Sequence, residues 1–173
     1  MSESPSAVVL DGNLYVFYQG ANDNGQLWYA CLSGVSGTWS APVQVFPTGE
    51  DATSILLFGT PSACLYTPAS GISQLFVAYA GTGTSDNWQL TYCTLGTDGT
   101  WMQAIVPGVL VTASPTAYAV SAAAYDSTDT GSATGRLNIF FQPASCPGEL
   151  YYCVYNGSGR LSAPHRSRRW TDG

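Results

Sequence analysis

The chain contains no lysine and carries little charge of either sign. Only 9% of its 173 residues are charged, the five basic residues are all arginines, and the net charge is −6. This balance disfavours nonspecific attraction to nucleic-acid phosphates or to anionic lipid, because neither partner would release counterions to an acidic surface. The apolar content of 45%, with 13% aromatics, still predicts one ordinary domain with a hydrophobic core.

Histidine is almost absent, and cysteine is not organised into a motif. His165 is the only histidine, and the five cysteines form an odd set without CxxC spacing. They are Cys31, Cys64, Cys93, Cys146 and Cys153. We therefore expect buried free thiols instead of a disulfide framework or a zinc site, and we expect no metal and no cofactor.

Long hydrophobic runs are also missing. No segment approaches the roughly 20 apolar residues of a membrane span, and the first residues have neither the basic start nor the apolar run of a signal peptide. We expect a soluble protein without membrane insertion or a nucleic-acid partner, which is cytoplasmic or released without a conventional signal peptide.

The sequence does contain an internal repeat with a period of roughly 55 residues. "SPSA" at Ser4 returns as "TPSA" at Thr60 and as "SPTA" at Ser114. Three further apolar runs follow in each copy: "LYVFYQ", "LFVAYA" and "LNIFFQ"; then "QLWYAC", "QLTYCT" and "ELYYCV"; then "GTWSAPVQV", "GTWMQAIV" and "GRLSAP". Turn formers such as "DGN", "GTDG" and "NGSG" separate the runs, so each copy is predicted to be four short antiparallel strands.

Four strands repeated at this period predict an all-β fold, a β-propeller with three four-stranded antiparallel blades in the chain. Both faces of "LYVFYQ" are largely apolar, as expected for a sheet that is covered on both sides. A β-sandwich is the alternative, but it does not predict three copies in register. The expected boundaries are 4–59, 60–113 and 114–164 for the blades and 165–173 for a basic C-terminal tail.

Three blades cannot close a ring, since known propellers use about four to eight. Two large apolar blade faces would remain exposed, and patches of that kind mark interfaces. We therefore predict a twofold homodimer with a six-bladed ring. The alternative is that the chain is a fragment of a longer propeller.

Groups for catalysis are sparse. "SGVSGTW" and "TDGTW" resemble the Asp-box of sialidase propellers, a structural motif, but a sialidase also needs an arginine triad. Only Arg136 lies outside the C-terminal cluster, which we interpret as a solvated tail, with a basic docking patch as the alternative. We predict that the protein is not an enzyme.

Aromatic and amide side chains stand beside one another at the strand edges. Sugars present C–H faces that stack on aromatic rings and hydroxyl groups that need fixed hydrogen-bond partners. The repeat separates two neighbouring rings: Tyr29 recurs as Tyr92 and Tyr152 and is predicted to pack in the scaffold, whereas Trp28 does not recur and is predicted to contact a sugar or the next blade. The full set of predicted carbohydrate-binding residues is Asp23, Asn24, Gln26, Trp28, Trp39, Asp86, Asn87, Trp88, Gln89, Trp101, Glu149 and Tyr151.

The segment "NLYVFYQGANDNGQLWYAC" resembles the strand-turn-strand unit of the Aleuria-type fucose lectins, which are β-propeller lectins of fungi and bacteria, and the resemblance extends over all three copies. It implies a propeller fold and glycan binding. In that family an arginine on the second strand and a glutamate on the third hold fucose, and here aromatic residues and an asparagine stand at those positions. The matching positions are Tyr15, Phe76 and Asn138, then Tyr29, Tyr92 and Tyr152. The fucose clamp is therefore not expected.

These observations predict a lectin that binds glycans or glycoconjugates multivalently in pockets between blades. Two alternatives stay open: a non-catalytic propeller scaffold for protein–protein interaction, and a fragment of a sialidase-like glycosidase propeller.

Overall fold

The computed structural model describes residues 4–20, 25–48, 56–68, 71–82, 87–96, 98–112, 120–127, 134–143, 149–155 and 161–167. Every regular element in this described part is a β-strand, and it contains no helix long and apolar enough to cross a membrane. The strands are β1 (Ser6–Leu10), β2 (Asn13–Gln19), β3 (Leu27–Leu32), β4 (Val43–Gln44), β5 (Leu57–Tyr66), β6 (Gln74–Thr82), β7 (Asn87–Leu95), β8 (Trp101–Thr112), β9 (Val120–Ser127), β10 (Thr134–Phe141), β11 (Tyr151–Tyr155) and β12 (His165–Arg166).

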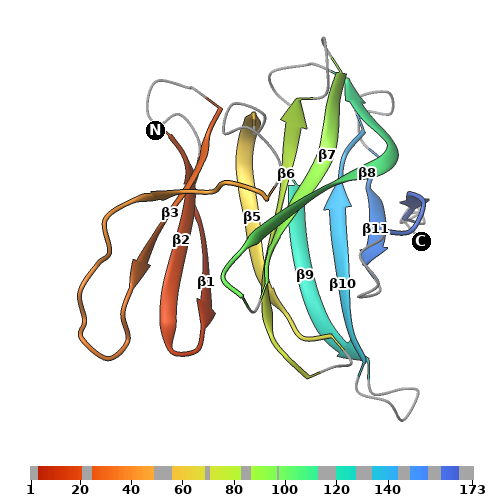
Figure 1. Ribbon diagram of the computed structural model, residues 1–173. Coiled ribbons are helices and arrows are strands. Elements are labelled where there is room, and N and C mark those ends of the chain that lie inside the picture. The colour runs from red at the N-terminus through yellow and green to blue at the C-terminus, as the bar shows by residue number, and fades with distance from the viewer. Residues whose placement is uncertain are drawn as a thin grey trace, which may run out of the picture.

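The strands form three antiparallel sheets, and each sheet follows the chain order as a meander. We name β1–β4 blade 1, β5–β8 blade 2 and β9–β12 blade 3. Figure 1 shows blade 2 between the other two. The all-β fold with three four-stranded propeller blades, predicted from the repeat, is confirmed.

Tight turns join neighbouring strands where the sequence carries turn formers. Asp11 and Gly12, between β1 and β2, both have positive φ angles, of 50° and 75°. Two such residues in succession form the primed turn that suits the right-handed twist of a hairpin.

Among the described residues, the hydrophobic core forms two clusters, one on each face of blade 2. In β6, Leu75, Val77 and Tyr79 belong to the cluster shared with blade 1, whereas Phe76 and Ala78 belong to the cluster shared with blade 3. Because successive strand residues point to opposite faces, the apolar run of β6 is buried on both sides.

The strand registers define which residues are equivalent in the three blades. The Cα partners at one such position are Ala7 with Val16, Ala63 with Val77, and Ala122 with Ile139. Ser121–Ala122 therefore takes the place that Ser6–Ala7 and Ser62–Ala63 hold in the other blades. We predicted that "SPTA" is the third copy of this Ser-Ala motif, but it lies outside the described residues. The strand register instead places the later pair Ser121–Ala122 at the equivalent position.

The same hydrogen bond joins the first strands of neighbouring blades twice. Ala63 donates its backbone N–H to Ser6 Oγ over 2.9 Å, and Ala122 donates its N–H to Ser62 Oγ over 2.9 Å. β5 thus lies next to β1 on one side and next to β9 on the other.

The fourth strand of blade 3 includes two residues that we predicted to be tail. His165 and Arg166 pair with Tyr152 and Tyr151 of β11. The turn before them repeats the one in blade 1: Cys31 donates its N–H to Ser40 Oγ, as Val154 does to Ser162 Oγ, over 3.0 Å in both cases. The prediction of a tail is wrong for these two residues, because the repeated serine turn returns the chain to the sheet.

Candidate functional site

A group with polar side chains occurs at the same place in each blade, where the third strand pairs with the fourth, and in blades 1 and 3 it includes an aromatic ring. We call these the third-strand groups. The Cα partners that define them are Trp28 with Gln44, Thr91 with Ile105, and Tyr151 with Arg166. Two residues before the first partner of each pair stand Gln26, Gln89 and Glu149. Gln89 and Thr91 lie two apart on β7 and so share a face of blade 2, and a hydrogen bond between Tyr151 and Glu149 shows that these two side chains lie together in blade 3.

The third-strand group of blade 3 is charged. Arg166 forms an ion pair with Glu149, and the Tyr151 hydroxyl donates a hydrogen bond of 3.4 Å to the other carboxylate oxygen. The Arg166 side chain is 49% exposed and that of Glu149 is 18% exposed. A guanidinium has five N–H donors in a fixed plane, so Arg166 presents donors to solvent beside an oriented acceptor and an aromatic ring.

The group of blade 1 has no charge, and two of its donors lack partners. Trp28 and Gln44 are partly buried, and the buried atoms Trp28 Nε1 and Gln44 Nε2 have no hydrogen-bond partner. A buried donor without a partner costs about 1–3 kcal/mol, so native structures contain few of them. These two N–H groups can therefore bind an acceptor from outside the described residues, a water molecule or a ligand oxygen.

The group of blade 2 is the least accessible of the three. Thr91 is buried and donates its hydroxyl to the Gln89 carbonyl oxygen over 3.2 Å. The Gln89 Oε1 atom is a buried acceptor without a partner. Since Thr91 stands where the other blades have Trp28 and Tyr151, this group lacks an aromatic ring at the central position.

The other predicted site residues fall in different environments. Trp101 is 6% exposed and packs at 5.8 Å, in an edge-to-face arrangement, on the Phe17 ring of blade 1 and at 6.0 Å on Tyr29. Trp39 holds the equivalent position in blade 1 but is 55% exposed. The structure thus separates two tryptophans that share a sequence motif. Asp23, Asn24 and Asp86 lie outside the described residues, and only the backbone of Asn87 and Trp88 is described.

Sequence reasoning missed Gln44 and Arg166. Both lie on two-residue strands that have no periodic pattern, and Arg166 belonged to the predicted tail. A signal was present, because the triplet Ser-Ala-Pro precedes both strands, at residues 40–42 and 162–164. When the copies are aligned on that triplet, Arg166 stands at the position equivalent to Gln44. The prediction that Tyr29 packs in the scaffold is confirmed, since it packs against the cluster between blades 1 and 2.

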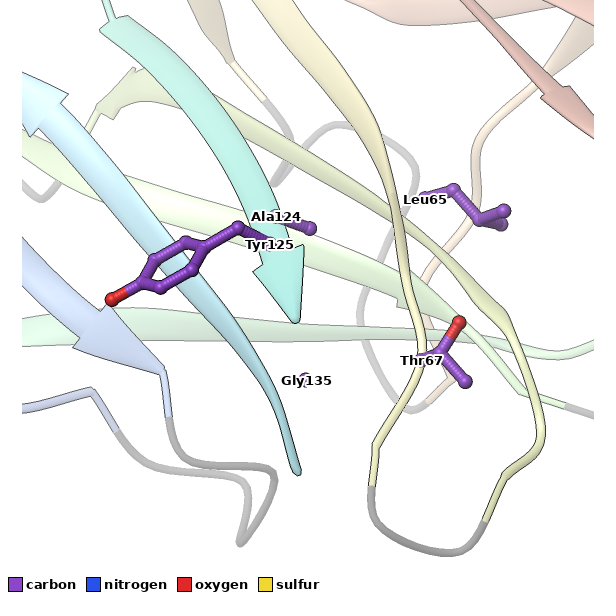
Figure 2. A pocket seen from close by; sticks show the side chains of 5 residues that line it. All are labelled: Leu65, Thr67, Ala124, Tyr125 and Gly135. Carbon is purple, nitrogen blue, oxygen red and sulfur yellow. The ribbon is translucent and has the colours of Figure 1, made fainter. Parts of the chain in front are cut away.

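A small pocket lies away from these groups, between blades 2 and 3. It has a volume of about 150 Å³ and is lined by Leu65, Thr67, Ala124, Tyr125 and Gly135. Figure 2 shows the side chains of Leu65 and Tyr125 pointing in opposite directions, and the Thr67 hydroxyl is hydrogen bonded to Ser73 over 2.9 Å. No predicted site residue lines this pocket, and its polar side chains do not converge. We interpret it as a gap in packing and not as a ligand site.

The described cysteines are free thiols, of which Cys93 and Cys153 are buried, as predicted, and Cys31 and Cys64 are only partly buried. Burial raises the pKa of Cys64 and Cys93 to about 12 and that of Cys153 to about 11. A protonated thiol is a poor nucleophile and a poor metal ligand. Within the described ranges, no three His, Cys, Asp or Glu side chains gather as a metal site would require.

Comparison with known proteins gives a likeness in fold and none in sequence. No family model matches the chain, and no curated protein does. Among solved structures, the chain is similar to a fucose lectin from Kordia zhangzhouensis in complex with methyl-fucoside, with a TM-score of 0.55 and 13% identity, over 96% of this chain and 99% of that one. At this level of identity the likeness concerns the fold alone.

Proposed function

We propose that the protein is a lectin, which binds glycans through its third-strand groups. The observation that carries this proposal is the group of blade 3, where one carboxylate is bonded to both a guanidinium and a phenol at a partly exposed place. Sugar hydroxyls donate and accept hydrogen bonds, and sugar C–H faces stack on aromatic rings. Arg166, Glu149 and Tyr151 together supply all three kinds of contact. The likeness to a fucose lectin supports the proposal at the level of the fold.

The group of blade 1 extends the proposal to a second kind of site. Trp28 offers an indole ring, and the unpartnered N–H groups of Trp28 and Gln44 fit acceptor oxygens of a sugar. Several sites in one chain, and more in a homo-oligomer, would make weak individual contacts into multivalent binding. The group of blade 2 contributes least, because Thr91 is buried and is not aromatic.

The proposal is for binding without turnover. Glycoside hydrolysis uses two carboxyl groups on opposite sides of the scissile bond. The group of blade 3 has one carboxylate, and its ion pair with Arg166 orients it as a hydrogen-bond acceptor. Incubation with fluorogenic glycosides is expected to release no fluorophore.

The direct test is a glycan array, followed by calorimetric titration with the best ligand. We expect Arg166→Met and Glu149→Gln to weaken binding at least tenfold, which corresponds to about 1.4 kcal/mol. Because a partly exposed ion pair contributes about 0–1 kcal/mol to folding, both variants should remain folded. Met102→Gln, a 61% exposed residue of β8, is the matched control and should bind as the native protein does. An array without binding by the assembled native protein would refute the proposal.

The scaffold alternative is favoured by one observation, the partly exposed apolar face of blade 1 on which Trp28 lies. The two functions predict different results for Trp28→Ala. A lectin loses the glycan affinity of the blade 1 group, whereas a scaffold loses partner binding and has no glycan affinity to lose.

A further inference from the structure

Blade 1 and blade 3 each have one face that contributes nothing to the two core clusters of the described chain. The blade 1 outer face consists of Leu14, Val16, Tyr18, Trp28, Leu32 and Trp39, and the blade 3 outer face of Ser121, Tyr125, Asn138, Phe140 and Tyr152. None of these residues belongs to either cluster. Both faces are rich in aromatic side chains, so each resembles a blade face that lacks its neighbour.

The repeat shows what covers such faces. Leu75, Val77 and Tyr79 of β6 are fully buried against blade 1. Their equivalents in β10, Leu137, Ile139 and Phe141, are at most 3% exposed and are buried against blade 2. The equivalents in β2 are on the blade 1 outer face and are only partly buried. The same surface is thus covered by a preceding blade twice, and in blade 1 none of the described strands covers it.

An aromatic contact between blades 1 and 2 shows which residues correspond to one another on the two outer faces. Trp101 of blade 2 packs on two rings of blade 1, Phe17 and Tyr29, whose centroids are 5.7 Å apart at an angle of 39°. Blade 3 repeats that ring pair on its outer face, where Phe140 and Tyr152 are 6.1 Å apart at 42°. Trp39, 55% exposed, occupies the place of Trp101 in blade 1.

The hydrogen bond that joins the first strands of neighbouring blades also has an equivalent acceptor in blade 3 and an equivalent donor in blade 1. Ser6 and Ser62 each accept the backbone N–H of the next blade. Ser121 is the equivalent acceptor in blade 3 and is exposed, and Ala7 is the equivalent donor position in blade 1 and is exposed.

The remaining polar groups on these faces are of opposite kinds. Trp28 Nε1 and Gln44 Nε2, on the side of the blade 1 outer face, are buried donors without partners. Asn138 Oδ1, on the blade 3 outer face, is a buried acceptor without a partner. Donors on one face and an acceptor on the other make the two faces complementary in hydrogen bonding.

We propose that the partner for these faces is a second copy of the chain. Two copies close a six-bladed ring through two identical contacts, each of which joins the blade 1 outer face of one copy to the blade 3 outer face of the other. Trp39 packs on the partner's Phe140 and the partner's Tyr152, and Ala7 donates its N–H to the partner's Ser121. The group of Trp28 and Gln44 then lies in a groove that the partner's blade 3 completes. This assembly requires no glycan.

The primary experiment measures mass in solution by light scattering across a concentration series. The native protein is expected at twice its chain mass of 18.2 kDa. Trp39→Asp and Phe140→Asp should each give monomers, because each places a carboxylate in both contacts. Val35→Asp, at a residue that is 99% exposed and off both faces, is the matched control and should stay dimeric.

Mixing the two monomeric variants tests which faces meet. A pair made of one Trp39→Asp copy and one Phe140→Asp copy keeps one fully native contact, so the mixture should form dimers that neither variant forms alone. Circular dichroism confirms that each variant is folded before mixing. A native protein that stays at its chain mass or exceeds twice that mass, a Trp39→Asp variant that remains dimeric, or a folded mixture that stays monomeric would each overturn the inference.

Discussion

Replacing Trp101 tests the packing between blades 1 and 2, and the chain provides its own controls. Trp101 is 6% exposed and lies edge-on to Phe17. Truncating a buried tryptophan to alanine costs about 3–5 kcal/mol, because it removes buried apolar surface and leaves a cavity. In a chain of this size each kcal/mol lowers the melting temperature by about 2–4 °C, so Trp101→Ala should lower it by roughly 6–20 °C.

Two further substitutions set the scale for that result. Leu161 fills the equivalent place in blade 3, so Trp101→Leu should cost about half as much as Trp101→Ala. Trp39→Ala, studied in a monomeric background so that no second copy covers it, should cost less than about 1 kcal/mol because Trp39 is 55% exposed there.

The assay is urea denaturation followed by circular dichroism, with the midpoint and the slope compared among the three variants. We expect Trp101→Ala to lower the free energy of unfolding the most, Trp101→Leu to lower it less, and Trp39→Ala to lower it the least. If Trp101→Ala costs less than about 1 kcal/mol, or if Trp39→Ala in the monomer costs as much as Trp101→Ala, the assignment of these positions to packing on a preceding blade is refuted.

Three other predictions concern stability and use the same denaturation assay. Burial raises the pKa of the Cys93 thiol to about 12 in the folded chain, so the unfolded state ionises first and stability falls as pH rises above about 9. This thiol should contribute a loss on the order of 1 kcal/mol at about pH 10, which Cys93→Ala should lack. Gly135→Ala should destabilise by more than about 2 kcal/mol, because its Cβ would lie 2.0 Å from the Thr67 carbonyl oxygen, whereas Gly12→Ala, with open space and φ of +75°, should cost about 1 kcal/mol. Ser62→Ala should cost about 1–3 kcal/mol, because it leaves a backbone N–H of β9 without its acceptor.

The blades could be predicted from the sequence because the repeat and the apolar runs indicate the same strands. A run such as "LFVAYA" is apolar at every position, and β6 is buried on both faces. The start of blade 3 was harder to predict, because the region before β10 contains both "SPTA" and "VSAAAYD". A short motif in a stretch rich in serine and alanine matches more than once, and only the pairing of Ala122 with Ile139 decides between the matches.

The candidate site was predicted in part, for reasons of local pattern. Trp28 and Tyr151 could be recognised, since a ring stands two residues after an amide or acid at the start of an apolar run. Arg166 could not, because a two-residue strand has no periodicity and its role depends on a partner across the sheet. Trp39 and Trp101 share the motif "GTW", and what separates them is that Trp101 packs on Phe17 of blade 1 and is 6% exposed, whereas Trp39 is 55% exposed.

The proposed function and the proposed ring together predict how binding depends on assembly. The group of Glu149 and Arg166 lies on the face of blade 3 that packs on blade 2 of the same chain, so it is complete in a single copy. The group of Trp28 and Gln44 needs the partner's blade 3 to complete its groove. Calorimetric titration of Trp39→Asp should therefore show about half as many glycans bound per chain as the native dimer, with affinity at the surviving site unchanged for a monovalent sugar. Loss of all binding in this monomer would place the blade 3 group outside the site, and an unchanged stoichiometry would show that the blade 1 group does not depend on ring closure.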